Sequence, residues 1–304
     1  MSFYNEFCSY CEKIGCEYST EALLRDYTSF RIGGKADVMV FPDSAEKFSG
    51  IIKFLSNNNI VFLVIGKGSN LLVSDNGFKG VVINTCRFDG IELADETTIV
   101  CDAGISLSKL CRFALDHSLE GLEFAFGIPG TAGGAAYMNA GAYGGEMKDV
   151  LVSCKHINND GEIEEYKGDE LCLSYRHSAY SDTDKLIISL TLKLSKGDKN
   201  EIKAKMDDLM GRRRDKQPLE FPSAGSTFKR PEGYFAGALI EECGLKGFTV
   251  GGAQVSEKHA GFVVNIGNAT AKDVIGVIDH CKETVYSQKG VILEPEVKII
   301  GRED

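Results

Sequence analysis

Residues 121–145 are the part of this sequence that most restricts how the chain can fold. The segment reads GLEFAFGIPGTAGGAAYMNAGAYGG, and glycine and alanine occupy more than half of its positions. It has few large side chains with which to fill a core, so its backbone must approach something else closely. We therefore interpret the glycine-rich part, residues 127–144, as the lining of a groove.

A shorter glycine cluster, Gly66-Lys67-Gly68-Ser69-Asn70, directly follows the apolar stretch 60–65. The amides of a tight turn after a strand can hold a pyrophosphate. Leu71 stands where the dinucleotide fingerprint has its third glycine, and the spacing is not that of a P-loop. The cluster therefore disfavours a Rossmann domain and a P-loop NTPase, and by itself it is more readily explained as a structural turn.

Considered together, the two clusters favour a bound dinucleotide. Neither comes with a catalytic lysine or a magnesium-binding pattern, so the dinucleotide is expected to be held for its redox group and not as a phosphoryl donor. A purely structural role for either loop is the alternative.

The hydrophobic pattern predicts an α+β chain. ADVMVF, SAEKFSGIIKFLSNNN and IVFLVI, within residues 36–65, read as strand, helix and strand. Asn158-Asn159-Asp160-Gly161 lies between two strand-like stretches and predicts a β-hairpin. Further strands are predicted at 80–85, 97–104 and 185–194, and helices at 106–118 and 201–216.

The pattern also predicts where the first large unit ends. Residues 195–200, SKGDKN, are expected to be a linker, and the charged helix after them stops at Pro218. The remaining segments predict a small α+β domain.

Composition excludes several classes of protein. The formal charge is −10, from 34 basic and 44 acidic residues, which argues against a broad nucleic-acid-binding face. No apolar run is long enough to span a bilayer, and the first residues lack an export signal. We therefore expect no membrane partner, a cytoplasmic location and reduced cysteines.

Cys8, Cys11 and Cys16 raise the possibility of a metal site, because Cys8 and Cys11 have the spacing of metal ligands. A second Cys or His pair is missing. We favour the alternative, in which Cys8 and Cys11 lie on one face of an N-terminal helix as small hydrophobic residues. No metal is expected.

Six motifs carry a resemblance to a known family: GKGSNLLV, GIPGTAGGAAYMNAGAYGGEMKDV, LSYRHSAY, GSTFKRP, KHAGFVVN and LEPEVKIIG. They resemble the signatures of the UDP-N-acetylenolpyruvoylglucosamine reductases and occur in family order between about residues 28 and 301. Little separates Tyr180 from the strand at Lys185, so the chain is similar to the shorter form of this family.

The resemblance implies an α+β fold with an FAD-binding domain of the vanillyl-alcohol-oxidase (PCMH) type. It implies an FAD-binding region at 1–197, with subdomains at about 1–60 and 61–197, and a substrate-binding domain at 198–288. Residues 289–304 would form a C-terminal strand that carries Glu296 and returns to the FAD-binding region.

The implied enzyme reduces UDP-N-acetylglucosamine enolpyruvate to UDP-N-acetylmuramate in peptidoglycan precursor synthesis. The resemblance implies non-covalent FAD as cofactor and NADPH as co-substrate. We expect a monomer, although the sequence alone does not give the oligomeric state. The residues that it implies for FAD binding are Gly66, Lys67, Gly68, Ser69, Asn70, Leu71, Gly127, Ile128, Pro129, Gly130, Thr131, Gly133, Gly134, Asn139, Ala140, Gly141 and Ala142.

The resemblance also implies three catalytic residues, Arg176, Ser226 and Glu296. Arg176 suits the substrate carboxylate, because a guanidinium is planar and always charged. Ser226 would supply a proton to the carbanion-like carbon. Glu296 would act as a protonated acid beside the enolate. Without the resemblance these would be a surface ion pair, a turn residue and an edge carboxylate.

The basic run Arg212, Arg213, Arg214 and Lys216 is the densest in this acidic chain. Arg213 and Lys216 are expected to face the substrate pyrophosphate, with the other two exposed, although a solvated helix end is the alternative. Lys229 is expected near the site.

Two other functions are compatible with these features. One is a flavoenzyme of the same fold that oxidises an alcohol, for which no attachment signature for covalent flavin is seen. The other is a nucleotide-binding protein without activity. The joint presence of Arg176, Ser226 and Glu296 argues against both.

Overall fold

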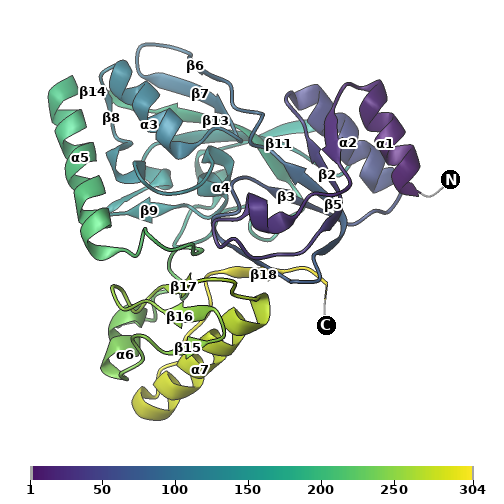
Figure 1. Ribbon diagram of the computed structural model, residues 1–304. Helices are drawn as coiled ribbons and strands as arrows, with labels where there is room; N and C mark the ends of the chain where they lie inside the picture. Colours follow the sequence, from purple (N-terminus) through teal and green to yellow (C-terminus); the bar gives the residue numbers. More distant parts are fainter. Residues whose placement is uncertain (1–2, 303–304) are drawn as a thin grey trace. The chain divides into compact units, whose positions relative to one another are not determined.

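The computed structural model describes residues 3–302 and divides into two compact units (Figure 1). The first unit holds the chain up to residue 19, then 38–67 and 80–212. The second holds 20–37, 68–79 and the chain from residue 213 onward. Residues 1, 2, 303 and 304, at the outer ends of the expected domains, lie outside the described residues.

One sheet of the first unit has the order β1 (Glu17–Ser19), β2 (Ala36–Phe41), β5 (Phe78–Asn84) and β3 (Phe62–Ile65). The helices α1 (Phe3–Lys13) and α2 (Ala45–Asn57) belong with it (Figure 1). Ser44 caps α2 by accepting a hydrogen bond from Lys47 N at 3.3 Å. The predicted strand, helix and strand within residues 36–65 are therefore confirmed.

The apolar face of α2 explains how it is fixed to this sheet. Phe48, Ile51, Ile52 and Leu55 recur at helical spacing and are fully buried in one hydrophobic cluster with strand residues such as Val81.

A five-stranded antiparallel sheet forms the rest of the first unit's framework. Its order is β12 (Ile163–Lys167), β11 (Leu151–Ile157), β13 (Leu186–Lys193), β7 (Thr98–Asp102) and β6 (Ile91–Leu93). The predicted hairpin is confirmed, because β11 and β12 pair from Ile157 with Ile163 onward. The helices α3 (Leu107–Asp116), α4 (Ala132–Tyr137) and α5 (Lys199–Lys216) complete this part, with the short strands β8 (Leu119–Glu120), β9 (Gly141–Ala142), β10 (Gly145–Glu146) and β14 (Ser195–Lys196).

Residues 195–200 are not the linker that the sequence predicted. Ser195 and Lys196 form β14, which pairs with β8, and Asp198 accepts the first helical amides of α5. Ile202 and Met206 of α5 are buried in the core of the five-stranded sheet. The first unit therefore continues through Arg212.

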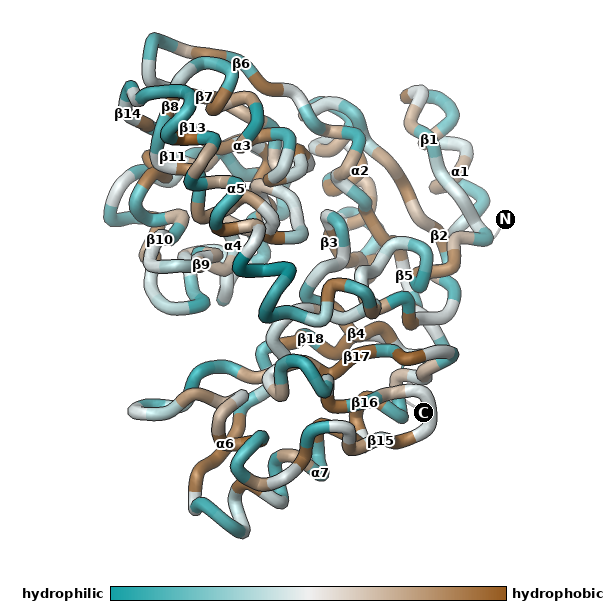
Figure 2. Tube along the Cα trace, turned by 60° about the vertical axis from the view of Figure 1, so that its left-hand side comes forward, coloured by the Kyte–Doolittle hydropathy of each residue, from teal (hydrophilic) through white to brown (hydrophobic). Residues whose placement is uncertain are grey.

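The second unit has a three-stranded sheet of β15 (Thr249–Val250), β16 (Ala253–Val255) and β17 (Val263–Asn265) with α6 (Ala236–Glu242) and α7 (Ala271–Lys289). A capping box of Thr270 and Asp273 begins α7, and Gly290, with φ of 69°, ends it. The strand β4 (Leu71–Val73) pairs in parallel with β18 (Lys298–Ile300). Figure 2 shows β4 and β17 as hydrophobic segments, in keeping with the buried Leu72 and Val263.

The N-terminal cysteines have a packing role. Gly15, with φ of 63°, ends α1 in a Schellman motif, in which Cys16 N donates to Cys11 O at 2.9 Å. Cys11 and Cys16 are buried, and burial raises the pKa of the Cys11 thiol to about 12. Among the described residues, no group of three or more His, Cys, Asp or Glu side chains is placed to hold a metal ion.

The helices within residues 3–302 include none that combines the length and the apolar character needed to cross a bilayer.

Candidate functional site

The two glycine clusters meet in the first unit. A Cβ placed on Gly66 would lie 2.4 Å from Oγ1 and 2.8 Å from Cγ2 of Thr131. A side chain at position 66 would therefore force Thr131 to move, so glycine allows the two loops to approach this closely. Asn84 fixes the same point, because its Nδ2 donates to Gly66 O at 3.4 Å and its Oδ1 accepts from Cys86 N at 2.9 Å.

Backbone donors remain available where the loops meet. Within the part of the chain that the structure describes, the amides of Gly66, Lys67, Gly130 and Thr131 donate to no protein acceptor. Backbone amides that converge in a glycine turn bind phosphate oxygens. This junction therefore fits a pyrophosphate such as that of FAD.

Other predicted glycines are required by packing within the protein. Gly133 lies against Ala103, where a Cβ would come within 2.7 Å of the alanine Cβ. Gly141 lies in the hairpin of β9 and β10, where a Cβ would meet Glu146. In the second unit, Gly68 has φ of 58° and faces Tyr27 O. The structural explanation thus accounts for these three positions.

Other predicted loop residues also lie at or beside these loops. Ala140 is buried and Thr131 caps α4, whereas Pro129 and Gly134 are exposed. The half-buried members are Ile128, Gly127, Ser69, Asn70, Leu71 and Ala142.

Arg176 stands in a tight turn of the first unit. His177 N donates to Ser174 O at 3.2 Å, and Ser174 N donates to His177 O at 3.1 Å. Arg176 has φ of 56° at the third position of this turn, where glycine is the preferred residue. A left-handed arginine costs of the order of 1 kcal/mol or more, so the contacts around this turn must hold it in place.

The far end of this turn is fixed by buried hydrogen bonds. Ser178 Oγ donates to Tyr137 O at 2.6 Å. The hydroxyl of Tyr180 lies 3.1 Å from Nδ1 of His156, whose Nε2 lies 3.2 Å from Glu164. Burial lowers the pKa of His156, so its ring is neutral and donates from Nε2 to Glu164. The hydroxyl of Tyr180 is then shared between Nδ1 of His156 and the carbonyl oxygen of Cys154, to which it donates at 3.3 Å.

Glu164 completes this chain of side chains at the surface. The pKa of Glu164 is lowered to about 2, and the largest cause is the hydrogen bond that Lys185 donates to it. The carboxylate is therefore charged at neutral pH. The Lys185 ammonium lies 4.7 Å from the centre of the Tyr166 ring.

Ser226 and Glu296 come together within the second unit. Glu296 N donates to Thr227 O at 2.8 Å, and an isolated bridge pairs Phe228 with Pro295. Asn70 Nδ2 donates to Glu296 O at 3.2 Å. Ser226 is exposed and Glu296 is half-buried. Glu296 precedes β18, so it does not lie in the C-terminal strand that the sequence predicted to carry it.

The predicted substrate-binding cations have different surroundings. Arg213 is buried and its Nη1 donates to Gln217 at 3.3 Å, whereas Lys216 is exposed. Lys229 is half-exposed and pairs with Glu294 at 3.2 Å, beside the segment that carries Glu296. Arg212, in the first unit, pairs with Asp208.

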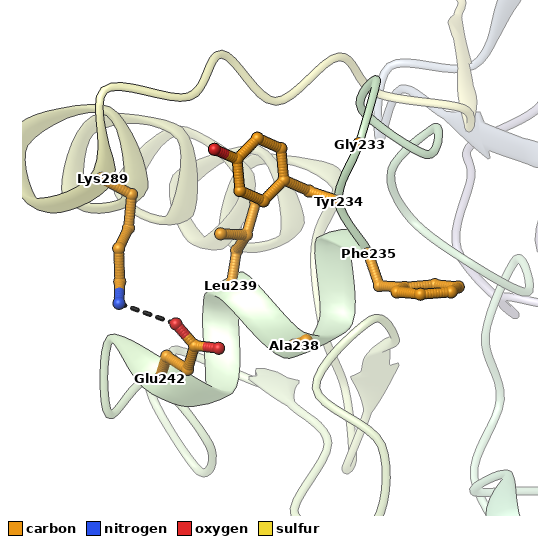
Figure 3. A pocket seen from close by; sticks show the side chains of 7 residues that line it. All are labelled: Gly233, Tyr234, Phe235, Ala238, Leu239, Glu242 and Lys289. Carbon is orange, nitrogen blue, oxygen red and sulfur yellow. Dashed lines mark hydrogen bonds and ion pairs between the residues drawn. The ribbon is translucent and has the colours of Figure 1, made fainter.

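A pocket of about 390 Å³ on α6 contains no predicted site residue. Figure 3 shows the Tyr234 ring above Leu239, the Phe235 ring pointing away, and the ion pair of Lys289 with Glu242 at 2.7 Å. The other lining residues are Gly233 and Ala238.

Sequence reasoning missed Asn84, Ser178 and Tyr180 as residues that hold the loops. The only local signal was an asparagine at the end of the predicted strand 80–85 and the polar residues after Arg176.

Two family models match the chain in order. Residues 36–167 match "FAD binding domain", and residues 217–300 match "UDP-N-acetylenolpyruvoylglucosamine reductase, C-terminal domain".

Whole proteins extend these matches over nearly the full chain. The UDP-N-acetylenolpyruvoylglucosamine reductase of Clostridium novyi is 48% identical over 94% of this chain and 93% of its own length. That of Clostridium tetani is 47% identical over 100% of this chain and 99% of its own length. The crystal structure of the enzyme from Thermus caldophilus superposes with a TM-score of 0.80 at 35% identity, covering 93% of this chain and 98% of that one.

The fold expected from the sequence, an FAD-binding domain of the PCMH type with a smaller α+β domain, is therefore confirmed. The length of the chain, 304 residues, is consistent with the shorter form of the family. Because identity approaches one half over the whole length of both chains, this FAD-dependent protein belongs to the UDP-N-acetylenolpyruvoylglucosamine reductase family.

Proposed function

We propose that the chain reduces UDP-N-acetylglucosamine enolpyruvate to UDP-N-acetylmuramate with electrons from NADPH. The structural observation that carries the proposal is the junction of Gly66 with Thr131, which presents unused amides from both glycine loops at one place. These loops are separated widely in sequence, and a dinucleotide pyrophosphate gives a reason for bringing them together.

A bound FAD would supply the redox step, by taking a hydride from NADPH and delivering it to the methylene carbon of the enol ether. Lys67 and the amides of Gly66, Gly130 and Thr131 would hold its pyrophosphate. We assign FAD binding to residues 1–197 and substrate binding to residues 198–288. Residues 289–304 would carry Glu296 and return to the FAD-binding region.

The protein's own side chains then have to manage charge and one proton. The guanidinium of Arg176 binds the enolpyruvyl carboxylate, and it binds more tightly as negative charge grows there during hydride addition. Ser226 donates a proton to the adjacent carbon, so that hydride and proton together saturate the double bond. Glu296, in its protonated form, donates a hydrogen bond to the enolate oxygen.

The half-reactions test this function directly. The purified protein should be yellow, should release FAD on acid precipitation, and should be bleached by NADPH without oxygen. Anaerobic addition of the UDP-enolpyruvyl sugar should then restore the colour.

A flavin that stays on the precipitated protein would contradict non-covalent binding. Reduction of the flavin by an alcohol, without reoxidation by the sugar, would favour another flavoenzyme. No reduction by either donor would favour a protein without activity.

Arg213→Ala is expected to weaken binding of the UDP-sugar more than it slows the reaction at saturation. A charge-assisted hydrogen bond to phosphate contributes roughly 1.5–3 kcal/mol, so KM should rise about ten- to a hundredfold with kcat little changed. Steady-state kinetics would measure this.

Arg212→Ala is the matched control, because Arg212 is exposed and pairs with Asp208. Since Arg213 is buried, a thermal melt must show that the Arg213 variant is folded at the assay temperature. If the Arg213 variant has the same KM as the control, Arg213 does not bind the substrate and only stabilises the end of α5.

A further inference from the structure

Asn139 joins the second glycine loop to the turn that carries Arg176. The residue is 2% exposed, and its Nδ2 donates to Ser174 O at 3.0 Å and to Glu146 Oε2 at 2.8 Å. Its Oδ1 accepts from Lys148 N at 2.9 Å. A carboxamide has two N–H donors, so both are used inside the protein. The side chain of Asn139 therefore has no donor left for a cofactor.

The backbone at both ends of this link is unusual. Asn139 has φ of 43° and Arg176 has φ of 56°, both in the left-handed region. Asparagine tolerates this region better than most residues, whereas arginine does not. Ser174, which accepts from Asn139, is the first residue of the turn in which Arg176 is the third. The link is thus within two residues of the strained position.

The turn has separate anchors on its two sides. On the C-terminal side, Ser178 and Tyr180 bind the neighbouring loop and the buried His156. On the N-terminal side, Ser174 is itself exposed, so without Asn139 its carbonyl can turn toward water and the turn can tilt. A displacement of about 1 Å at a catalytic group can cost about a hundredfold in rate.

We infer that Asn139 is a positioning residue for Arg176, and that it fixes this turn to the glycine loop on which the flavin is held. The inference rests on the proposed function of Arg176. The resemblance implied Asn139 as an FAD-binding residue, and the inference gives its side chain this positioning role. It predicts that loss of the Nδ2 donor slows the step in which substrate is reduced and leaves flavin reduction by NADPH nearly unchanged.

Asn139→Asp is the sharpest test, because it keeps the size and the Oδ1 acceptor and replaces only the donor. The new carboxylate oxygen would face Ser174 O and Glu146, two acceptors. Anaerobic reoxidation by the UDP-enolpyruvyl sugar should slow about ten- to a hundredfold at neutral pH.

The pH profile of Asn139→Asp distinguishes positioning from a general loss of structure. Burial and the Glu146 carboxylate raise the pKa of the new carboxyl above its usual value of about 4, whereas the Lys148 ammonium, which pairs with Glu146 Oε2 at 3.1 Å, acts in the opposite direction and is the weaker influence because it is exposed. As the pH falls through this raised pKa, the protonated group regains a donor, so reoxidation should recover toward that of the wild type. Asn139→Gly, which suits the positive φ but has no donor, should be equally slow at neutral pH and should not recover.

Amide hydrogen exchange gives a readout that does not depend on catalysis. In Asn139→Asp, exchange at residues 174–178 should speed up at neutral pH. The matched control is Asn84→Asp. It removes another buried amide donor, the one that Asn84 Nδ2 directs to Gly66 O in the first glycine loop. In this control, exchange at residues 174–178 should stay as in the wild type.

The outcomes separate the inference from the proposed function. If the sugar does not reoxidise the wild-type protein, the proposed function fails, while the exchange measurement still tests the link. If the wild type is active and Asn139→Asp matches it in rate, pH profile and exchange, the inference is wrong. Equal slowing of both half-reactions with loss of FAD would also overturn it, because Asn139 would then act on the flavin loop itself.

Discussion

Ser226→Ala should be reduced by NADPH at nearly the normal rate but reoxidised by the UDP-enolpyruvyl sugar about 10² to 10⁴ times more slowly. That range is what a positioned general acid contributes. A proton donor to the substrate has no part in flavin reduction, so only one half-reaction should change. Ser226 is exposed, so the loss of its hydroxyl should affect folding little.

Anaerobic stopped-flow absorbance of the flavin would measure both half-reactions for Ser226→Ala. Ser226→Cys keeps a donor and should recover part of the rate if the proton is what is missing. Ser287→Ala, an exposed serine on α7, is the matched control and should behave as the wild type. Equal slowing of both half-reactions, or normal reoxidation of Ser226→Ala, would make Ser226 a structural residue of its turn.

Arg176→Ala should lower the rate of substrate reduction by about 10² to 10³, the usual effect of removing one group that stabilises transition-state charge. Arg176→Gly should lose as much activity but should be more stable than Arg176→Ala by about 1 kcal/mol. The two variants differ only in a Cβ, and at φ of 56° that Cβ is strained.

Urea unfolding of the two Arg176 variants would measure the difference in stability, and single-turnover reoxidation would measure the loss of activity. Arg176→Lys tests the shape of the group, because an ammonium cannot bind a carboxylate in the bidentate way. If Arg176→Ala reduces the sugar as fast as the wild type, Arg176 has no part in the reaction. Equal stability of the Ala and Gly variants would mean that the turn relaxes.

Much of the local structure could be predicted from the sequence, because its signals lie in neighbouring residues. The spacing of Phe48, Ile51 and Leu55 gave α2, and the Asn-Asn-Asp-Gly stretch before Glu162 gave the hairpin of β11 and β12. The glycine clusters pointed to a bound dinucleotide, and the family's motifs supplied Arg176, Ser226 and Glu296, whose roles remain predictions.

The linker at residues 195–200 was predicted wrongly for a physical reason. Gly, Asp, Lys and Asn in this segment are typical of exposed connections. Its strand, β14, exists only because β8 offers a partner, and that pairing depends on chain that is distant in the sequence. Short strands without their own hydrophobic pattern have no local signal.

The sequence by itself determined the helices α2, α3 and α5, the hairpin of β11 and β12, the glycine clusters and the family, but not the short helix α4 within the second cluster. Only the tertiary structure decided that Gly66 lies against Thr131, that Thr227 pairs with Glu296, and that Asn139 holds the turn of Arg176. Helical periodicity, caps and turns are set by residues within a few positions of one another. Contacts between distant residues are set by how the whole core packs, and no short stretch of sequence encodes that packing.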